Sequence, residues 1–431
     1  MKKKKTLLGI ILIPILLVVL VQGCLPFLTL ILSGIKPNLE KKTIETNTHM
    51  VEKNQVILEN DMVEKWRGIY EESDELNDNL RKILSENQID IQAFLSGDEV
   101  QEQYLEQVFP QLVEQLQYGT TSGVFLILAN DTSLDQESNY HGFFVRDSDP
   151  QTKTASNTDL LMERGSKQLS QNLSISLDSA WTTDFTFSGY GNRDADQFYY
   201  APYIAAREHI NSRMENLGYW SNPFILEDHY MDSHKMITYS VPLKYDDNVY
   251  GVLGVEISLN YLQNYLSVDD LDNSQNAGYA LVIKENDESY TVVTSKGTLS
   301  NAAKKDGIIN LEQESSNHLR KVKNAKIGTQ NIYAILEPLS LYSNNVPYSD
   351  TEWMLCGLVT EDSVYGLGTK VYTRITVSIL ISGFLAVVCV YVLSRHVTKP
   401  VSRLAESVRG GVKEFENFLN QEFRKLMNFM M

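Results

Sequence analysis

One carboxylate stands out in this sequence because it interrupts a long apolar run. Glu256 lies inside GVLGVEISL, and the surrounding residues 235–266 read KMITYSVPLKYDDNVYGVLGVEISLNYLQNYL. Burying a carboxylate is costly unless a partner compensates it. Glu256 is therefore a candidate anchor for a ligand. The alternative is a buried acid that the backbone or a tyrosine hydroxyl satisfies.

Aromatic side chains gather in the stretch 180–230 without a simple period. They are Trp181, Phe185, Phe187, Tyr190, Phe198, Tyr199, Tyr200, Tyr203, Tyr219, Trp220, Phe224 and Tyr230. Such a density can build a hydrophobic core. It can also line a small-molecule pocket, since ligand sites are mostly apolar and aromatic with a few polar anchors. Both interpretations stay open for each of these residues.

Other chemistries find little support in the residue pattern. His229 and His234 lie near Glu227, Asp228 and Asp232, but a spacing of five does not place two histidines on one helix face. No Gly-x-Ser-x-Gly elbow occurs. The three cysteines suggest neither a disulfide framework nor a metal motif. We predict no metal site, no cofactor, no catalytic residues and no enzyme activity.

The charge of the chain is strongly acidic. A net charge of −17 over 431 residues argues against a nucleic-acid partner, which requires a basic footprint. Lysines 2–5 and the basic residues after position 394 concentrate positive charge near the two termini, so the residues between them are still more acidic. An acidic exterior favours cationic over anionic ligands through long-range attraction.

Two apolar runs predict membrane-spanning helices. Residues 6–35 and 375–393 are each about long enough to span, because roughly 20 apolar residues cross a bilayer. Basic residues precede the first run and follow the second, and such residues stay in the cytoplasm. We therefore predict a two-pass protein of the cell membrane with both termini cytoplasmic and 36–374 extracellular. A cleaved signal peptide, or a lipoprotein signal ending at Cys24, are the alternatives that the length of the first run disfavours.

The outer segment mixes helical and strand patterns. Residues 38–87 predict one long helix and a second from about Asp74, and a further helix precedes Gly119. Residues 123–128 and 140–145 read as strands, and 160–173 as a helix. The alternation in 237–245 predicts a half-buried strand, which a turn at 246–248 joins to the apolar strand 249–259.

A weak internal repeat links the two halves of this outer segment. Each half reads as a strand containing Pro-Leu, a loop, an apolar strand and a helical turn that begins at a serine. This pattern aligns Glu256-Ile257-Ser258 with Glu361-Asp362-Ser363, and the second unit is smaller.

These features resemble the double Cache sensor domain of bacterial transmembrane receptors. The resemblance rests on GYWSNPF at 218–224, on MITYSVPL and on VYGVLGVEISLNYL, and it covers residues 38–374. It implies an α+β fold: two stacked PAS-like Cache units with antiparallel sheets on a long N-terminal helix, flanked by two transmembrane helices. The implied domains are a cytoplasmic tip (1–5), transmembrane helix 1 (6–35), a stalk helix with the membrane-distal unit (36–267), the membrane-proximal unit (268–370), transmembrane helix 2 (375–393) and a cytoplasmic HAMP-like helical stub (394–431).

The resemblance also implies a binding site in the membrane-distal unit. Members of the family that bind amino acids carry an Arg-x-Trp-Tyr motif and an acid in the last strand. Here the motif corresponds to Gln197-Phe198-Tyr199-Tyr200 and the acid to Glu256. Gln197 cannot hold a carboxylate with a charged bidentate pair, so a polar or cationic ligand fits better than an α-amino acid. The predicted ligand-binding residues are Tyr190, Asp196, Gln197, Tyr199, Tyr200, Trp220 and Glu256.

The segment after the second span resembles the start of a HAMP relay helix, with Pro400 following the span. It is too short to hold a complete HAMP unit and an effector. We expect a homodimeric membrane sensor for a small molecule that lacks its own output domain, either as a truncated receptor or as a sensor whose output lies on another protein. Its signal would reach a cytoplasmic effector such as a diguanylate cyclase, a histidine kinase or a chemotaxis module. The alternative is a membrane-anchored ligand-binding or adhesion protein that does not signal.

Overall fold

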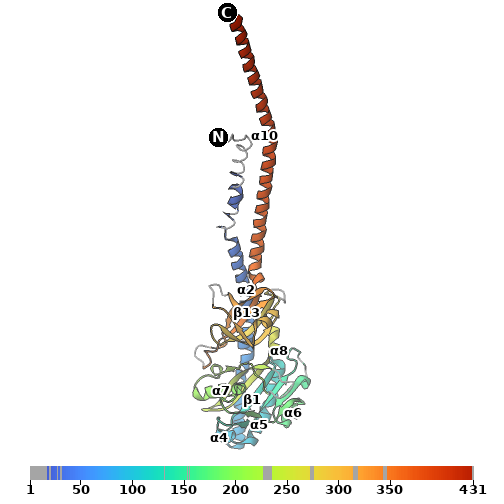
Figure 1. The fold of residues 1–431 in the computed structure, drawn as a ribbon. Helices are drawn as coiled ribbons and strands as arrows, with labels where there is room; N and C mark the ends of the chain where they lie inside the picture. Colours follow the sequence, from blue (N-terminus) through green and yellow to red (C-terminus); the bar gives the residue numbers. More distant parts are fainter. Residues whose placement is uncertain are drawn as a thin grey trace. The chain divides into compact units, whose positions relative to one another are not determined.

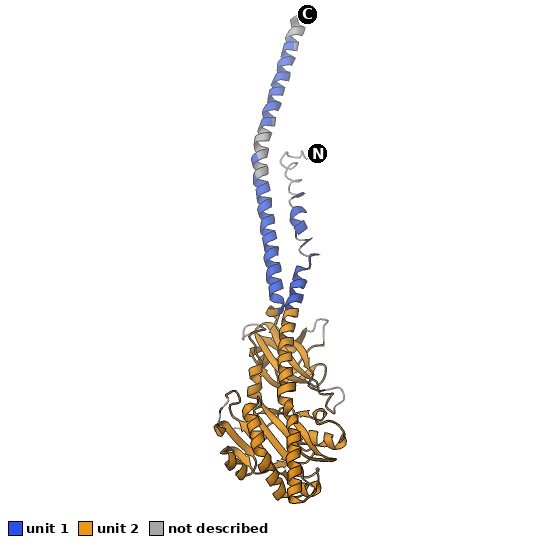
Figure 2. Cartoon of the chain, turned by 180° about the vertical axis from the view of Figure 1, so that it is seen from behind, with its two compact units in different colours: residues 1–43, 364–431 blue, residues 44–363 orange. Residues whose placement is uncertain are grey.

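The computed structural model describes residues 32–429 and parts of 17–29. Within 32–429 it leaves out residues 131, 153, 155, 227–234, 272–275, 314–318 and 343–346. The chain divides into two compact units, one made of residues 1–43 and 364–431 and the other of residues 44–363 (Figure 2).

The first unit is dominated by the helix α10 (Leu367–Phe429), which follows a π-helical turn, η7 (Asp362–Gly366). Residues 362–392 are long and apolar enough to cross a membrane, because they contain an 18-residue window with a mean hydropathy of 2.5, and they include most of the second predicted span. This is the one such segment among the described residues. Most of the first predicted span, and the whole cytoplasmic tip, lie outside the described residues.

The second unit begins with a long run of helices, as the sequence predicted. The first is α2 (Ile35–Asn60), which starts in the first unit, and it is followed by the π-helical η1 (Asp61–Trp66), the 3₁₀ helix η2 (Arg67–Glu72) and α3 (Ser73–Asn87). Gln88 ends α3 in the left-handed conformation, and its N–H bonds back to Leu84 and Ser85. Two further helices follow, α4 (Ile91–Leu95), which the Asp90 side chain caps, and α5 (Asp98–Tyr118).

A seven-stranded sheet forms the first β-layer of this unit (Figure 1). Its strands, in the order in which they pair, are β5 (Ser176–Thr182), β4 (Leu160–Arg164), β3 (Gly142–Asp147), β1 (Gly123–Leu128), β9 (Asn248–Ser258), β8 (Met236–Tyr245) and β7 (Tyr219–Trp220). All neighbours are antiparallel except β4 and β5. The predicted hairpin of β8 and β9 is therefore the central part of this sheet.

Two helices cover opposite faces of this sheet. On one face α5 packs through Phe109 against Phe143 and through Tyr104 against Tyr250. On the other face α7 (Gln197–Glu208) packs Phe198 against Phe125. The sequence did not predict α7, because three consecutive aromatic residues at 198–200 obscure the helical spacing. A small second sheet of β2 (Ser138–Tyr140) and β6 (Phe185–Phe187) adds aromatic side chains to the α7 side.

Two expectations for this region are wrong. Residues 160–173 do not form one helix, because Gly165 takes a φ of +128° and separates strand β4 from a helix that starts only at Lys167, α6 (Lys167–Leu173). The strand β8 is also not half-buried. Thr238 and Ser240, which alternate with its apolar residues, are both fully buried. The remaining short helices are η3 (Asn157–Asp159), η4 (Asp194–Asp196), η5 (Met214–Asn216), α8 (Leu259–Leu262) and η6 (Gln263–Tyr265).

A six-stranded antiparallel sheet follows and is covered by α9 (Thr298–Ala303). In pairing order its strands are β12 (Ile308–Asn310), β11 (Ser289–Lys296), β10 (Ala277–Lys284), β15 (Trp353–Thr360), β14 (Gln330–Leu339) and β13 (Leu319–Ile327). Its central order β11-β10-β15-β14 repeats the order β3-β1-β9-β8 of the first sheet. The mixed α/β fold with antiparallel sheets and a long N-terminal helix is thus as predicted, whereas the exact domain limits stay a prediction.

The structure moves the alignment of the two repeats by three residues. Ser258 caps α8 by accepting a hydrogen bond from the N–H of Tyr261, and Thr360 does the same for the N–H of Ser363. Gly123 pairs with Glu256 in the first sheet, and Gly278 pairs with Leu358 in the second. Both observations match Glu256 with Leu358, and not with Glu361 as the sequence pattern suggested. Thr360, and not Ser363, is therefore the capping residue that corresponds to Ser258.

Candidate functional site

A row of polar side chains lies on the α7 face of the first sheet. Thr238 on β8 is directly opposite Glu256 on β9, and Ser240 is opposite Gly254. Directly opposed residues of an antiparallel pair point to the same face. Thr238, Ser240 and Glu256 are all 0% exposed. Within the described part of the chain, the hydroxyls of Thr238 and Ser240 have no hydrogen-bond partner. We call these three residues the polar row.

Two glycines make space around the polar row. A Cβ atom added to Gly123 would lie 2.5 Å from Oε2 of Glu256, so the Glu256 side chain lies across the backbone of β1. A Cβ atom on Gly254 would collide with the ring of Phe125. Large side chains at either position would displace the polar row or the aromatic residues beside it. The two glycines therefore leave space at the centre of this sheet face for the Glu256 carboxylate and the Phe125 ring.

Aromatic rings from α7, β2 and β6 form a cluster on the same side of the sheet. The ring of Tyr199 stacks on Phe187 at 4.9 Å and on Tyr203 at 5.4 Å, and it meets Tyr140 at 4.9 Å. Tyr200 packs edge-on against Tyr190 at 5.8 Å. All of these rings except Tyr190 belong to one hydrophobic cluster, together with the strand residues Phe125, Ile127, Met236 and Val252. We call the polar row and the strand residues of this cluster the floor of the candidate site, and the aromatic residues of α7 its aromatic cover.

Burial changes the acid–base properties of the cover. Desolvation raises the pKa of Tyr199 well above its usual value, and the neighbouring Tyr203 and Tyr140 raise it further. Burial also raises the pKa of Tyr200 and of Tyr140. All three phenols are therefore neutral in the physiological range and can donate as well as accept. The hydroxyl of Tyr199 has no hydrogen-bond partner among the described residues, although the ring is fully buried.

The N-terminal end of α7 holds the other predicted residues of this side. Asp196, which is 1% exposed, accepts a hydrogen bond from the N–H of Ser188 at 3.0 Å and lies 3.5 Å from Arg193. These bonds fix the loop before α7. Gln197 is the first residue of α7 and is half-buried. Tyr190 is half-exposed at the rim of the aromatic cluster.

Trp220 does not join this set. It is paired with Tyr239 on β8, whose side chain points to the face opposite Thr238 and Ser240. Its ring contacts Tyr239 at 5.0 Å, Trp66 of η1 at 6.3 Å and Trp353 of β15 at 6.5 Å. The structure thus brings Tyr199, Tyr200, Tyr190 and Asp196 together around α7, places Glu256 on the floor and leaves Trp220 behind the sheet.

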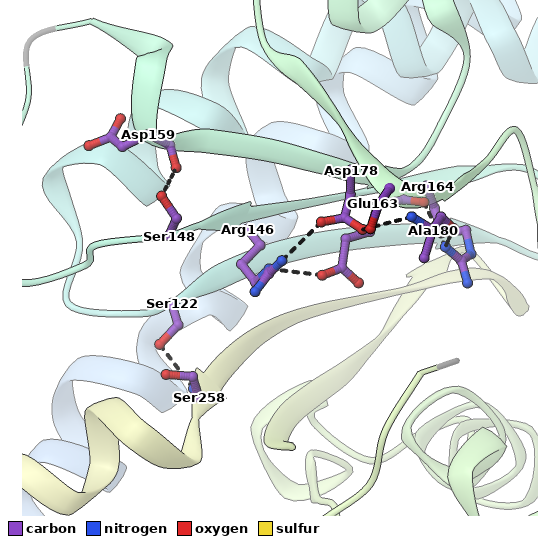
Figure 3. A network of polar contacts seen from close by, with 10 residues as sticks. Ser122, Arg146, Ser148, Asp159, Glu163, Arg164, Asp178, Ala180 and Ser258 are labelled. Atoms are coloured by element: carbon purple, nitrogen blue, oxygen red, sulfur yellow. Dashed lines mark hydrogen bonds and ion pairs between the residues drawn. The ribbon is translucent and has the colours of Figure 1, made fainter. Parts of the chain in front are cut away.

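A charged network joins the strands β3, β4 and β5 of the same sheet (Figure 3). Arg146 is paired with Gly123, which is paired with Glu256, so Arg146 belongs to the same row of the sheet face. Its guanidinium contacts Glu163 at 2.9 Å and Asp178 at 3.0 Å. Arg146 is thus bound by two carboxylates of its own. Arg164 donates to the carbonyls of Glu163 and Ala180.

Sequence reasoning missed several members of this site. Thr238 and Ser240 were assigned to the outer face of a half-buried strand, and Tyr140 and Arg146 were not singled out. The predicted hairpin is the signal that could have identified Thr238 and Ser240. Once its register is known, Thr238 pairs with Glu256 and Ser240 with Gly254. No group of three or more His, Cys, Asp or Glu side chains in the described residues is placed to hold a metal. The histidine pair 229 and 234 lies outside the described residues.

One family model matches the part of the chain that contains α7, β8 and β9. Residues 171–264 match the family model for the first PDC sensor domain of methyl-accepting chemotaxis protein-like proteins. The match includes α7, β8 and β9, and therefore the polar row. A comparison with curated proteins finds no match.

Solved structures of chemoreceptor domains align with low identity. The ligand-binding domain of Tlp3 from Campylobacter jejuni, in complex with L-norvaline, is 13% identical, and the alignment covers 76% of this chain and 94% of that domain at a TM-score of 0.35. The domain of PctB from Pseudomonas aeruginosa PAO1, in complex with L-Arg, is 12% identical with 77% and 98% covered at 0.33. The domain of CtaA from Pseudomonas fluorescens, in complex with L-isoleucine, is 13% identical with 78% and 98% covered at 0.33.

The family-model match confirms the resemblance to Cache-type sensors that the sequence indicated. Residues 171–264 of this chain are similar to the first PDC sensor domain of methyl-accepting chemotaxis protein-like receptors.

Proposed function

We propose that this protein is a membrane-bound extracytoplasmic sensor that binds a small molecule between the polar row and the aromatic cover of α7. The observation that carries the proposal is the buried polar row itself. Among the described residues, the hydroxyls of Thr238 and Ser240 have no hydrogen-bond partner, in a place that folding alone would fill with apolar groups. A ligand with polar atoms would satisfy them.

The second sheet supports this assignment by contrast. In the matched registers Leu358 stands in place of Glu256, Ala334 in place of Thr238 and Leu336 in place of Ser240. Leu358 and Ala334 are fully buried in an apolar core that also holds Cys356. The same scaffold thus has a polar floor in the first sheet and an apolar one in the second. We assign ligand binding to the first.

The chemistry of the site favours a polar or cationic ligand. Glu256 offers a carboxylate, Thr238 and Ser240 offer hydroxyls, and the rings of Tyr199 and Tyr200 offer faces that attract cations. Arg146, the cation of the same row, is held by Glu163 and Asp178. Gln197 provides no charge for a ligand carboxylate. Amines and other cations with hydrogen-bond donors are the ligands that this set would recognise.

The ligand would act on the membrane through the chain that follows the second sheet. The strand β15 leads through η7 into α10, which contains the candidate span. In this proposal the protein is a homodimer in the cell membrane with both termini cytoplasmic. It passes a shift of the second span to a cytoplasmic effector such as a chemotaxis module, a histidine kinase or a diguanylate cyclase. It has no enzyme activity of its own.

A thermal-shift screen of the full chain in nanodiscs tests the binding step. We expect a rise in melting temperature with one or more members of a panel of polyamines, quaternary amines, amino acids, nucleosides and small organic acids. Glu256→Gln should abolish the rise. Glu106→Gln, at an exposed position of α5, is the matched control and should keep it. A ligand that stabilises Glu256→Gln as strongly as the native chain would remove Glu256 from the site.

The alternative function is a membrane-anchored binding or adhesion protein that does not signal. Crosslinking of the native Cys389 between two copies in the bilayer distinguishes the two, because Cys389 is exposed in the candidate span. A sensor should change its crosslinking rate when the ligand from the screen is added. An anchored binding protein should bind the ligand and keep the same rate.

A further inference from the structure

The edge of the first sheet contacts both the candidate site and the second sheet. Residues 219–224, which we call the edge segment, begin with the two-residue strand β7 and end at Phe224. Phe224 makes two backbone hydrogen bonds with Met236 on β8. The edge segment is thus fastened to β8 at both ends, since Tyr219 pairs with Ser240.

The edge segment contacts the site on the floor and on the cover. On the floor, the Ser221 hydroxyl accepts from the N–H of Thr238 at 2.9 Å, and the Ser221 N–H donates to the Thr238 carbonyl at 2.9 Å. On the cover, the ring of Phe224 stacks on Phe198 of α7 at 5.0 Å with an interplanar angle of 17°. A change in α7 or in the backbone of Thr238 therefore reaches the edge segment directly.

The edge segment is also bound by the connection between β14 and β15 of the second sheet. The N–H of Trp220 donates to the hydroxyl of Tyr342 at 2.8 Å, and these residues are 122 positions apart in sequence. The ring of Tyr219 packs on Tyr348 at 4.9 Å, and Tyr348 also packs against the hydrophobic cluster of the site. The ring centroids of Tyr342 and Tyr348 are 5.9 Å apart.

These two tyrosines stand next to the strand that leads to the membrane. Tyr342 follows the end of β14 at Leu339, and Tyr348 precedes the start of β15 at Trp353. The ring of Trp353 meets Trp220 edge-on at 6.5 Å. The strand β15 then ends at Thr360, whose side chain caps the turn before α10. The contacts of the edge segment thus continue covalently into β15.

We infer that Tyr342 and Tyr348 are positioning residues that couple the ligand site to β15 through the edge segment. Movement of α7 or of the Thr238 backbone shifts the edge segment, and the Tyr342 hydroxyl and the Tyr348 ring carry that shift to both ends of the β14–β15 connection. The two sheets then act as one unit when a ligand orders the cover. The inference rests on the proposed function for its purpose, whereas the coupling itself exists without a ligand.

The buried thiol of Cys356 provides a reporter in the middle of β15. It is 1% exposed, and the chain has three cysteines in total, so Cys24→Ser and Cys389→Ser leave Cys356 as the single thiol. The rate at which a disulfide reagent labels Cys356 measures how often β15 opens. The full chain in nanodiscs is used throughout, and no ligand is needed.

The test is a double-mutant cycle between the cover and the coupling residues. Phe198→Leu loosens the cover and should accelerate Cys356 labelling by at least about threefold. In the background of Tyr342→Phe, which removes only the hydroxyl, or of Tyr348→Leu, the same change should have a much smaller effect. Tyr118→Phe, at an exposed position, is the matched control background and should leave the full acceleration intact.

Each outcome of this cycle decides the inference. Equal acceleration in the native, Tyr342→Phe and Tyr348→Leu backgrounds would overturn it, and so would no effect of Phe198→Leu in the native background. If Phe198→Leu does not fold, Ser221→Ala replaces it, because that change removes the hydroxyl that bonds Thr238. Failure here leaves the ligand-binding proposal standing, since no ligand takes part. Failure of the ligand screen leaves the coupling standing.

Discussion

At the scale of single residues, the site depends on how closely Glu256 lies against Gly123. Adding one methyl group at position 123 puts a carbon 2.5 Å from Glu256 Oε2 and 3.0 Å from the Phe144 ring. The carboxylate would have to leave its place on the floor.

Gly123→Ala is therefore expected to lower the free energy of unfolding by about 1–3 kcal/mol, the usual cost of overpacking, and to abolish ligand binding. Chemical denaturation measures the first effect and the thermal-shift assay the second. Gly68→Ala is the control, because a Cβ atom there meets nothing within 4 Å. Full ligand binding by Gly123→Ala would contradict the placement of Glu256.

Tyr199 gives a prediction in which stability and binding move in opposite directions. Its hydroxyl is buried and has no partner among the described residues, so Tyr199→Phe should raise the free energy of unfolding of the empty protein by up to about 1 kcal/mol. The same change should weaken ligand binding.

Tyr104→Phe is the contrasting variant for Tyr199, because the Tyr104 hydroxyl donates to the carbonyl of Leu76. It should lower stability and leave binding unchanged. Denaturation midpoints and binding isotherms of the two variants check both statements. A Tyr199→Phe protein that is less stable than the native chain would show that its hydroxyl has a structural partner.

At the scale of elements, His141 ties three segments together. Its Nδ1 lies 2.8 Å from Asp184, between β5 and β6, and its Nε2 lies 3.3 Å from Asp98 at the start of α5. The hydrogen bond with Asp184 raises the pKa of His141, burial works against that shift, and Asp98 adds to it. The protonated imidazole is the form that bridges both carboxylates.

The stabilising effect of His141 should therefore depend on pH. A histidine whose pKa is raised by folding contributes fully below its unfolded pKa of about 6.5, and the contribution is lost as pH rises through the folded pKa. His141→Gln should cost up to about 1 kcal/mol at acidic pH and nothing at alkaline pH, since the pair is partly exposed. Thermal denaturation at a series of pH values measures the difference. His49→Gln, whose pair with Glu52 is exposed, should show little dependence.

The helix α10 carries an apolar row that the described chain does not cover. Its members lie three or four residues apart, as in a coiled-coil seam, and are exposed: Leu404, Val408, Val412, Phe415 and Leu419. We expect Val408→Glu and Phe415→Glu to weaken the proposed homodimer in detergent, measured by sedimentation. Ser407→Glu, off this row, should not. Equal dimerisation of all three variants would exclude this row as the contact.

Sequence patterns predicted elements well where one period dominated. The hairpin of β8 and β9, the strand β1 and the long helices were recognisable because their apolar residues recur at regular spacing. The helix α7 was not recognisable, because its aromatic residues are consecutive at 198–200 and do not recur at helical spacing. Residues 160–173 were misassigned because a single positive-φ glycine at 165 separates a strand from a helix.

At the scale of the whole molecule, the site required information that sequence spacing does not contain. The sequence makes Glu256 a candidate through its apolar surroundings, and Tyr199 and Tyr200 through their resemblance to a motif, and their role in binding stays a prediction. Thr238 and Ser240 required the register of the sheet, and the exclusion of Trp220 required knowing which face it takes. Strand alternation identifies two faces, but only the packing of α5 and α7 tells which of them carries the aromatic cluster.

The proposed topology can be tested with two engineered thiols in a chain that lacks Cys24 and Cys389. Glu106→Cys on α5 should react with a membrane-impermeant maleimide in intact cells, because residues 36–374 are proposed to lie outside. Lys413→Cys on α10 should react only after permeabilisation. Both positions are exposed. The reverse pattern would place the sensor region in the cytoplasm.

The two repeated sheets carry different side chains at matching positions, and this difference affects which substitutions the protein can accept during evolution. At Leu358, Ala334 and Leu336 a new side chain must first satisfy folding, because those positions belong to or border a closed apolar core. At Thr238 and Ser240 the native hydroxyls make no hydrogen bond to the part of the chain that the structure describes, so many replacements should leave the fold intact and alter only binding at the proposed site. Under the proposed function, ligand preference can therefore diversify at the first sheet while the second sheet keeps its apolar core and its connection to α10 constant.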